Sequence, residues 1–292
     1  MNGPATALQT FRIGFDDRPY NLFVIRSGAR EFFGMKQPAA FHHAGQPPAN
    51  RSCLVAFADI VGEIHGIETD SSGYVLAYRA IDPAAVRAMV QARPGASELT
   101  YPLRRKLGGA ETVQTPAYWN NRAADPESLD ADEGFLREQA ATLLAPNLRS
   151  GDLVFDPACS TGRFLQEIGQ RAPGCRLRGQ ELSPQMVAIA RRRLADVRLG
   201  SADQPACADA AAQLLICRFL NLDVVTTDQA RGLFGRLVQC VAPGGRMLVV
   251  GHTPVLLTAA DMTRPDLALE KSHMLTPDGH ALYQFYLLKR CG

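Results

Sequence analysis

The sequence predicts an α/β fold whose C-terminal half forms a mostly parallel sheet with helices on both faces. Three observations support this. After about residue 150, apolar runs that suit buried strands alternate with helical patterns. The first run ends in an acid that small residues follow, and the second ends in an acid before a Ser-Pro helix start. The first 110 residues lack this alternation and predict a separate α+β unit.

In the N-terminal unit, two apolar runs flank a polar turn at 16–19 and predict a β-hairpin. A Pro-, Ala- and Gly-rich stretch at 37–50 predicts a loop, and Asp82-Pro83 predicts the start of a short helix that ends near residue 93. The basic residues 104–106 predict an exposed linker. The predicted strands are 11–15, 20–25, 52–60 and 74–81.

The C-terminal half yields a regular series of elements and closes with an antiparallel strand pair. The predicted strands are 153–156, 176–181, 197–200, 213–218, 246–251, 267–275 and 280–289. The predicted helices are 163–171, 183–196 and 227–241.

The stretch 154–165, VFDPACSTGRFL, is the most informative part of the chain. An apolar strand ends at Asp156, small residues follow, and a helix begins. Small residues let backbone and ligand approach closely, and the free N–H groups of the next helix point at the ligand. The stretch therefore predicts a site for a nucleotide-like ligand.

Three ordered motifs carry a family resemblance. Residues 156–162 resemble the D-x-G-x-G-T-G motif of class I S-adenosylmethionine (SAM)-dependent methyltransferases, 180–186 resemble the family's I-D-L-S-x-x-M, and 242–246 resemble its L-K-P-G-G turn. The resemblance covers about residues 130–292. Two motif glycines are replaced by Ala158 and Ser160, and because both are small we expect a tighter loop rather than a lost site.

The resemblance implies a Rossmann-like class I methyltransferase sheet with an N-terminal α+β cap domain. The expected organisation is a cap or lid at 1–110, a linker and lid segment at 111–134, and the SAM-binding domain at 135–292. SAM is the implied cosubstrate. No metal is expected, because the seven cysteines include no C-x-x-C pair.

The resemblance also implies a set of SAM contacts. Asp156 would face the ammonium group, directly or through water, and Glu181 would accept both ribose hydroxyls, as carboxylates do in dinucleotide sites. The other expected contacts are the loop residues Ala158, Ser160 and Gly162, Leu182, Met186 and Asp203 near adenine, and Arg218 and Phe219 under the methionine part.

Residues 115–121, which hold the only tryptophan, form a second distinctive segment. In many members of this family an aromatic segment here folds over SAM. The face of Tyr118 or Trp119 would attract a sulfonium by about 0.5–2 kcal/mol. The alternative is that both rings belong to an interdomain core.

Three residues are candidates for catalysis. His252, just past the fifth strand, is the best-placed general base, although a lone histidine is more often structural or at the surface. Asn221 would hydrogen-bond a polar group near the methionine part or cap its loop, and Tyr118 would face the sulfonium. His42 and His43 would reach the site if the first domain is a lid, or lie in a solvated loop.

Composition limits the partners. The chain has 292 residues, 46% of them hydrophobic, and a net charge of +2, which gives no argument for nucleic acid. The longest apolar stretches are too short to span a bilayer, and no secretion signal is evident. The scattered cysteines predict free thiols in the cytoplasm. We expect a monomer or homodimer with a small-molecule substrate.

The loop at 156–162 also resembles the D-P-A-C-G-T-G of DNA adenine methyltransferases. Those enzymes carry an N/D-P-P-Y box after the fourth strand, where this chain has RFLNL at 218–222. DNA is therefore not the expected substrate.

The resulting expectation is a SAM-dependent methyltransferase that acts on a small metabolite, in secondary metabolism. One alternative is a SAM cyclase of the same fold, in which the amine of SAM attacks its own γ-carbon and methylthioadenosine is released. A second is a non-catalytic SAM-binding regulatory subunit. The altered glycines allow it, but Asp156 and Glu181 are both present.

Overall fold

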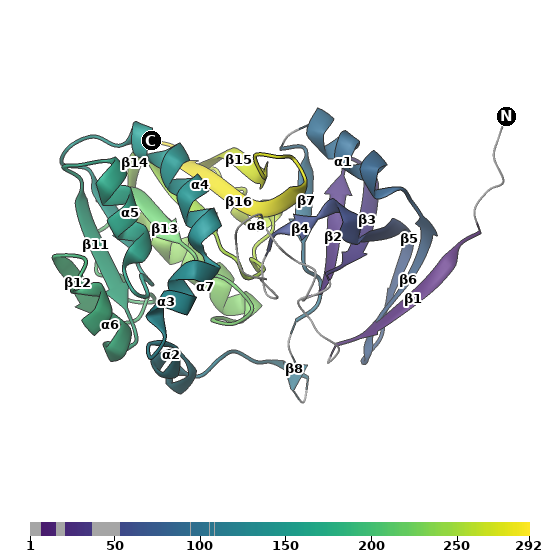
Figure 1. Ribbon diagram of the computed structural model, residues 1–292, viewed down its shortest axis with the longest axis horizontal. Coiled ribbons are helices and arrows are strands. Elements are labelled where there is room, and N and C mark those ends of the chain that lie inside the picture. The colour runs from purple at the N-terminus through teal and green to yellow at the C-terminus, as the bar shows by residue number, and fades with distance from the viewer. Residues whose placement is uncertain (1–6, 16–20, 37–52, 94, 105, 108) are drawn as a thin grey trace.

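The computed structural model describes residues 7–15, 21–36, 53–93, 95–104, 106–107 and 109–292. Figure 1 shows two regions side by side, an N-terminal sheet with one helix and a larger C-terminal α/β region. The N-terminal sheet has six antiparallel strands in the order β1-β6-β5-β3-β2-β7. These are β1 (Gln9–Gly14), β2 (Leu22–Ser27), β3 (Arg30–Met35), β5 (Ile60–Thr69), β6 (Gly73–Ala80) and β7 (Ser97–Thr100).

The helix predicted in this unit is confirmed. The helix α1 (Pro83–Ala92) begins after Asp82, whose carboxylate accepts a hydrogen bond from the Ala84 amide, and Pro83 stands at its first position. Val86 and Val90 face the core, and they fix the packed side of the helix.

The predicted hairpin between residues 11–15 and 20–25 is wrong. The strand β1 pairs with β6, whereas β2 turns directly into β3. Ser27 pairs with Arg30, and Gly28 has φ +62°, as a two-residue hairpin loop requires. The predicted strand at 52–60 is also wrong. It contains the two-residue strand β4 (Val55–Ala56) and a 3₁₀ turn (Phe57–Asp59) before β5 begins.

The C-terminal sheet runs in the order β12-β11-β10-β13-β14-β16-β15, with the first five strands parallel and the last two antiparallel. This confirms the Rossmann-like class I sheet. The strands are β10 (Leu153–Asp156), β11 (Arg176–Glu181), β12 (Asp196–Leu199), β13 (Ala212–Cys217), β14 (Val241–Val250), β15 (Leu267–Leu275) and β16 (Ala281–Arg290).

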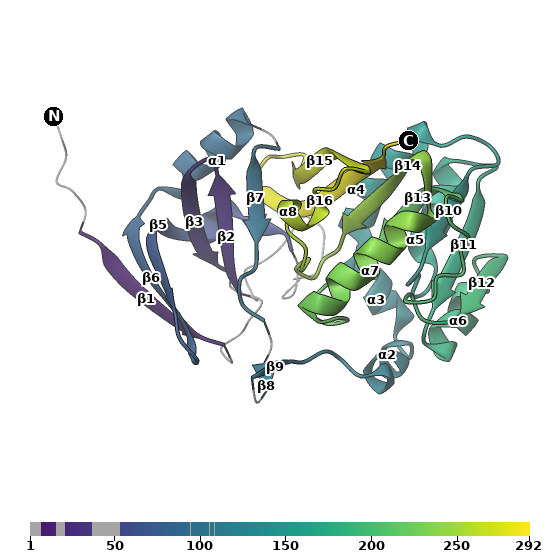
Figure 2. The same ribbon diagram turned by 180° about the vertical axis from the view of Figure 1, so that it is seen from behind.

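Helices cover both faces of this sheet. One core cluster joins the sheet to α4 (Gly134–Leu144), α5 (Arg163–Arg171) and α6 (Pro184–Ala190), and a second joins its other face to α7 (Thr227–Cys240). The helix α7 lies in front of the sheet in Figure 2. The remaining elements are β8 (Lys106–Leu107), β9 (Ala110–Glu111), α2 (Pro116–Arg122), α3 (Pro126–Asp132), a 3₁₀ turn (Ala145–Asn147) and α8 (Ala259–Met262).

The connection from β12 to β13 carries no helix, and none was predicted there. Polar side chains of β11 hold this loop instead. Gln180 donates to the Ser201 and Gln204 carbonyls and accepts from the Ala206 amide, and Arg178 donates to the Ala206 carbonyl. The helix predicted at 183–196 also ends earlier, at Ala190.

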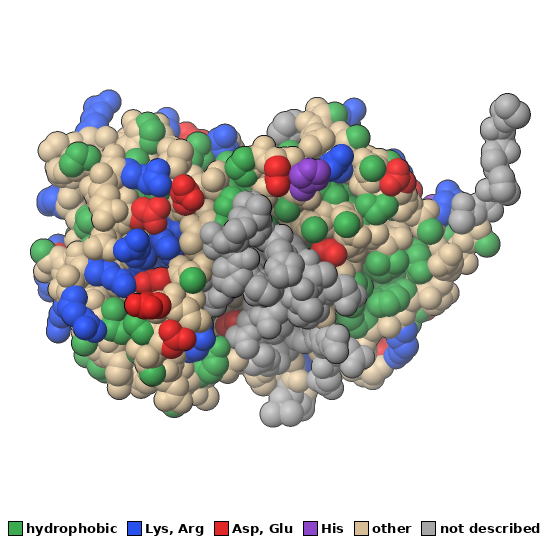
Figure 3. Space-filling view, in the orientation of Figure 1, with side chains coloured by type: hydrophobic (Ala, Val, Ile, Leu, Met, Phe, Trp, Pro, Cys, Tyr) green, Lys and Arg blue, Asp and Glu red, His purple; other side chains and the backbone are tan. Residues whose placement is uncertain are grey.

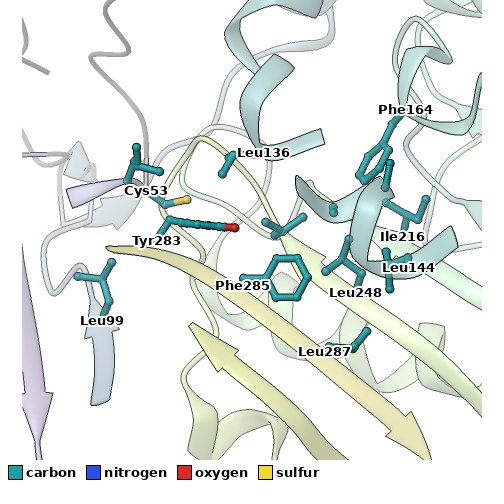
Figure 4. Packing of buried hydrophobic residues seen from close by; sticks show 14 of the residues in the cluster. Cys53, Leu99, Leu136, Leu144, Phe164, Ile216, Leu248, Tyr283, Phe285 and Leu287 are labelled. Atoms are coloured by element: carbon teal, nitrogen blue, oxygen red, sulfur yellow. The ribbon is translucent and has the colours of Figure 1, made fainter. Parts of the chain in front are cut away.

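The two regions share a sheet and a core. The strand β4 pairs with β16, and His273 Nε2 accepts a hydrogen bond of 2.8 Å from the Leu99 amide. Figure 4 shows Cys53 and Leu99 of the N-terminal region in the same cluster as Tyr283 and Phe285 of β16. The N-terminal region is therefore joined to the larger sheet through β4 and shares its core.

In the part of the chain that the structure describes, no helix is long and apolar enough to cross a membrane. No group of three or more His, Cys, Asp or Glu side chains in those ranges could hold a metal ion.

Candidate active site

A cavity of about 1090 Å³ lies at the carboxyl ends of the parallel strands. In parallel α/β sheets this is the edge where ligands bind. Its walls come from the 157–160 loop, the start of α6, the loop 200–203, residues 218–225, one side of α7 and the helix α2. Of the expected site residues, the lining includes Tyr118, Trp119, Ala158, Ser160, Glu181, Leu182, Met186, Asp203, Arg218, Phe219, Asn221 and His252.

Backbone conformation shapes the loop between β10 and α5. Gly162 has φ +76°, and a Cβ there would lie 2.9 Å from Leu194 Cδ1. Ser160 stands where the motif has glycine and still adopts φ +52°, a conformation that L residues rarely take. The Ser160 amide donates to Glu181 Oε2 at 2.9 Å, which stabilises the turn. The loop thus keeps the motif's conformation without its central glycine.

Glu181 ends β11 and is fixed from both sides. Its Oε2 accepts from the Ser160 amide, and its Oε1 accepts from the Ser183 amide at 2.9 Å. An ionised carboxylate has about four lone-pair positions, so both oxygens can still accept hydroxyl donors from the cavity. Ser183 also caps α6 by accepting from the Met186 amide.

The floor of the cavity is a buried charge network around Arg218, the residue that follows β13. Its side chain is 9% exposed and pairs with Glu133 and, at 3.4 Å, with Asp156. Its Nε is buried and has no hydrogen-bond partner among the described residues. A buried donor without a partner is costly, so Nε is suited to an anionic ligand group.

The network perturbs the pKa values of its members. Burial opposes ionisation of Glu133, but Arg218 and His252 outweigh it and lower the pKa of this carboxyl to about 2. Burial raises the pKa of Asp156 to about 6, although Arg218 acts in the opposite direction. Burial would lower the pKa of Arg218, but Glu133 and Asp156 raise it above its ordinary value. Arg218 therefore stays charged.

Two expected SAM contacts are not on the cavity wall. Asp156 is fully buried, accepts from the Ala158 amide at 3.1 Å and faces Arg218, so its carboxylate supports the floor rather than facing a ligand directly. Gly162 is the N-cap of α5 and serves the loop through its backbone conformation. The sequence alone could not tell whether Asp156 contacts SAM or holds Arg218 in place, because either role needs a carboxylate at the end of the strand.

His252 lies beside the network because β13 and β14 are parallel neighbours. Cys217 pairs with Val249, so the residues after both strands meet at one edge. His252 Nδ1 is 3.4 Å from Glu133 Oε1. Glu133 reaches this position because α3 ends and α4 begins there.

Asn221 lines the cavity, but its side-chain amide is used within its own loop. Its Nδ2 donates to the Arg218 carbonyl at 2.9 Å, and its Oδ1 accepts from the Asp223 amide at 3.0 Å. These bonds favour the loop-capping interpretation over a catalytic one.

Residues 109–122, which we call the strap, run across the mouth of the cavity. Glu111 accepts from the Thr227 amide at 2.6 Å at the start of α7, and the Gln114 amide donates to the Asp223 carbonyl. At the other end, Asn120 Oδ1 accepts from the Ser183 hydroxyl at 2.7 Å. The strap is thus pinned to the first turns of α7 and α6.

Tyr118 and Trp119 sit on the strap helix α2 and form a T-shaped pair with ring centroids 5.0 Å apart. Both rings are partly exposed, line the cavity and belong to none of the buried core clusters. They are therefore part of the cavity wall and not of an interdomain core. His42 and His43 lie outside the described residues.

Sequence reasoning missed Glu133, Gln114 and Asn120. Each stands outside the three motifs and reaches the cavity through tertiary packing. The only local signal was position, because all three precede the first strand of the parallel sheet, where cap and lid segments were expected.

Comparisons with known proteins agree with this geometry. A family model described as a methyltransferase domain matches residues 154–245. Isonocardicin synthase of Nocardia uniformis subsp. tsuyamanensis is 33% identical over 294 residues, covering 98% of this chain and 96% of that protein. The chain belongs to the class I SAM-dependent methyltransferase family. It is a SAM-dependent enzyme, and SAM is its cosubstrate.

Other relatives match shorter parts. Trans-aconitate 2-methyltransferase of Acidovorax sp. (strain JS42) is 36% identical over 96 residues, 33% of this chain and 36% of that protein. The structure of the N-methyltransferase NodS from Bradyrhizobium japonicum, in complex with S-adenosylhomocysteine, is 18% identical with a TM-score of 0.48 and covers 61% of this chain and 98% of that one. It resembles this chain in fold alone.

The residues present fit SAM. The unpartnered Nε of Arg218 suits its carboxylate, and Glu181 has lone pairs free for ribose hydroxyls. Near the expected adenine position, Met186 is buried and Leu182 is exposed, and both side chains line the cavity. When bound, SAM supplies an electrophilic carbon on a positively charged sulfur.

Proposed function

We propose that the protein transfers a group from SAM to a small-molecule metabolite. The methyl group is the group expected to be transferred, and the reaction belongs to secondary metabolism. The observation that carries this proposal is the extent of the cavity. Beyond the SAM motifs, its lining continues to Val224, Val225 and Leu233 and ends at Arg236 on α7. At about 1090 Å³ it lies slightly above the usual range of about 300–1,000 Å³ for small-molecule pockets. This leaves room for an acceptor beside SAM.

The name of the long relative supports a small-molecule role, since isonocardicin synthase is named for a small product. The charge distribution also supports it. On the face in Figure 3, basic and acidic side chains lie interspersed over the C-terminal region and form no basic stripe. We propose a cytoplasmic enzyme that works as a monomer or homodimer.

In this proposal the protein mainly aligns two reactants and excludes water. Arg218 and Glu181 hold the two polar ends of SAM. Tyr118 and Trp119 place aromatic faces near the sulfonium, an attraction of about 0.5–2 kcal/mol. The strap keeps both in place by its bonds to α6 and α7.

One rival reaction uses the same site. Intramolecular cyclisation needs a sheltered SAM and aromatics near the sulfonium, and the strap supplies both. The space next to Val224 and Leu233 argues against it, because cyclisation needs no acceptor. Membership of an enzyme family argues against the alternative of a non-catalytic SAM-binding subunit.

Product analysis tests the proposal. The purified protein is incubated with SAM, with and without a panel of small acceptors, and the nucleoside product is separated by chromatography. Methyl transfer gives S-adenosylhomocysteine only when an acceptor is present. Methylthioadenosine without any acceptor would establish cyclisation. Methylthioadenosine that appears only with an acceptor would show that the aminocarboxypropyl arm, rather than the methyl group, is transferred.

A further inference from the structure

Glu133 and His252 form a pair that the charge network alone does not explain. Both side chains line the cavity and both are mostly buried, with 19% and 21% of their surfaces exposed. Arg218 already neutralises Glu133 through the carboxylate's Oε2. The second oxygen, Oε1, is directed to His252 Nδ1 at 3.4 Å. The carboxylate thus serves two partners at once.

The contact favours one tautomer of the histidine. Glu133 is ionised, because its pKa is lowered to about 2, so it can only accept hydrogen bonds. The Nδ1 atom that faces it is therefore the nitrogen expected to carry the proton, which leaves the free lone pair on Nε2. A carboxylate that orients a histidine in this way makes the other ring nitrogen a positioned proton acceptor.

We infer that Glu133 is a positioning residue that holds His252 so that Nε2 removes a proton from the acceptor's nucleophilic atom. This rests on the proposed function and names the acceptor class, a hydroxyl or amine that still carries its proton at neutral pH. A carboxylate or thiolate acceptor would need no such base.

The step balances without another reactant. The nucleophile's lone pair forms the new bond to carbon, and the carbon–sulfur bond breaks with its electron pair left on sulfur. The proton of the nucleophile goes to Nε2 of His252, which becomes an imidazolium between Glu133 and the product. Glu133 keeps its charge throughout, since Arg218 holds it ionised.

One test reads the tautomer directly and needs no acceptor. Long-range ¹H–¹⁵N spectra of the full-length protein with S-adenosylhomocysteine should show His252 protonated on Nδ1 and bare on Nε2. The signal is assigned by its loss in His252→Gln. Glu133→Ala should shift it toward a mixture of tautomers, and Glu133→Gln serves if the alanine variant does not fold. A wild-type His252 protonated on Nε2 would overturn the inference.

A second test reads catalysis. The probes are a phenol, an aliphatic amine, a carboxylate and a thiophenol of similar size, each offered with SAM; the thiophenol is a thiol that is largely ionised at neutral pH. Wild-type turnover is expected with the phenol or the amine only. His252→Gln should lower kcat by about 100- to 10,000-fold with little change in KM for SAM. Glu133→Gln should lower kcat by at least about tenfold, because the ring loses its fixed orientation.

The matched control is His65→Gln, on an exposed histidine of β5, which should leave kcat unchanged. Equal turnover of the carboxylate or thiol probe by wild type and His252→Gln would defeat the inference but leave the proposed transfer intact. If wild type converts none of the four probes, the proposed function is in question, and the tautomer spectra still decide the role of Glu133.

Discussion

The floor and the roof of the cavity are built in opposite ways. The floor is a mostly buried network in which Arg218 binds two carboxylates, of which Asp156 is fully buried. The roof is the strap, which is partly exposed and held at separate points by one or two hydrogen bonds each, such as Ser183 to Asn120 and Thr227 to Glu111. Local opening has a low free-energy cost where few buried contacts must break. We therefore expect the strap to open while the floor stays rigid.

The largest effect is expected from Arg218→Leu. The variant leaves Glu133 and Asp156 as buried, uncompensated carboxylates, which typically costs about 3–5 kcal/mol. Denaturant unfolding and calorimetric titration with SAM should show lost stability and lost binding. The control is Arg236→Leu, an exposed cavity-lining residue, with a change within about 0.5 kcal/mol. Equal stability of the two variants would mean that the floor is not a structural unit.

The pH dependence of Glu133→Gln tests the same network. The folded-state pKa of Glu133 lies below its ordinary value of 4.5, so the ionised carboxylate stabilises the fold above pH 4.5. This contribution is lost as the pH falls from 4.5 toward 2. At neutral pH, wild type should exceed Glu133→Gln by up to about 3 kcal/mol in unfolding free energy.

The difference between the two proteins is the quantity to follow, because Asp156 acts in the opposite sense. Its folded-state pKa is raised to about 6, so it stabilises the fold as the pH falls from 6 toward 3.8. A wild-type advantage that stays constant down to pH 2.5 in urea titrations would contradict the role given to Glu133.

Glu181→Ala tests the carboxylate at the end of β11, which lies on the cavity wall between the Arg218 network and the strap. It should weaken SAM binding by about 1–3 kcal/mol if the carboxylate accepts ribose hydroxyls. Titration calorimetry measures this, with the exposed Glu68→Ala on β5 as control. An unchanged dissociation constant for a folded Glu181→Ala protein would remove Glu181 from the SAM site.

The strap should respond to ligand, whereas the floor should not. Saturating S-adenosylhomocysteine is expected to slow hydrogen exchange over residues 115–122 and to quench or shift Trp119 emission. Asn120→Ala removes the bond from Ser183 and should weaken ligand binding by about 1 kcal/mol without a comparable loss of stability. Unchanged exchange in the strap, together with full turnover by Tyr118→Ala, would show that the strap is ordinary packing.

The smallest effect is expected at Ser160. A serine at φ +52° is strained by roughly 1–2 kcal/mol, and glycine removes this strain but adds about 0.5–1 kcal/mol of unfolded-state entropy. Ser160→Gly should therefore stabilise the protein by about 1 kcal/mol or less, seen as a small rise in Tm. A clear loss of stability would mean that the hydroxyl stabilises the turn.

The sequence located the C-terminal sheet and most of the cavity wall, because those residues follow strands in three ordered motifs. Glu181 was found through its motif, whereas Arg218 and His252 were found by their positions after strands, since parallel strands bring their carboxyl ends together. Glu133 could not be found in this way. It reaches the site through the break between α3 and α4, which is a tertiary event without a motif.

The N-terminal region was harder to predict, because its strand pairing also depends on tertiary packing. Its strands alternate weakly, and their partners are chosen by packing rather than by order along the chain. The run at 11–15 pairs with β6 because β2 closes a tighter turn with β3 at Gly28. The helix α1 was predicted well, because its cap at Asp82 and its proline are local signals.

The pairing of β4 with β16 has a consequence for how the chain acquires its structure. Ala56 meets Ala281, so the junction cannot form until nearly all of the intervening chain has been made and ordered. Contacts between such distant segments carry a large loop-closure cost and slow folding. Until then, the edge of β16 and the apolar residues around Val55 stay uncovered. Exposed apolar surface favours aggregation, so the nascent chain is at risk there until its last strands emerge.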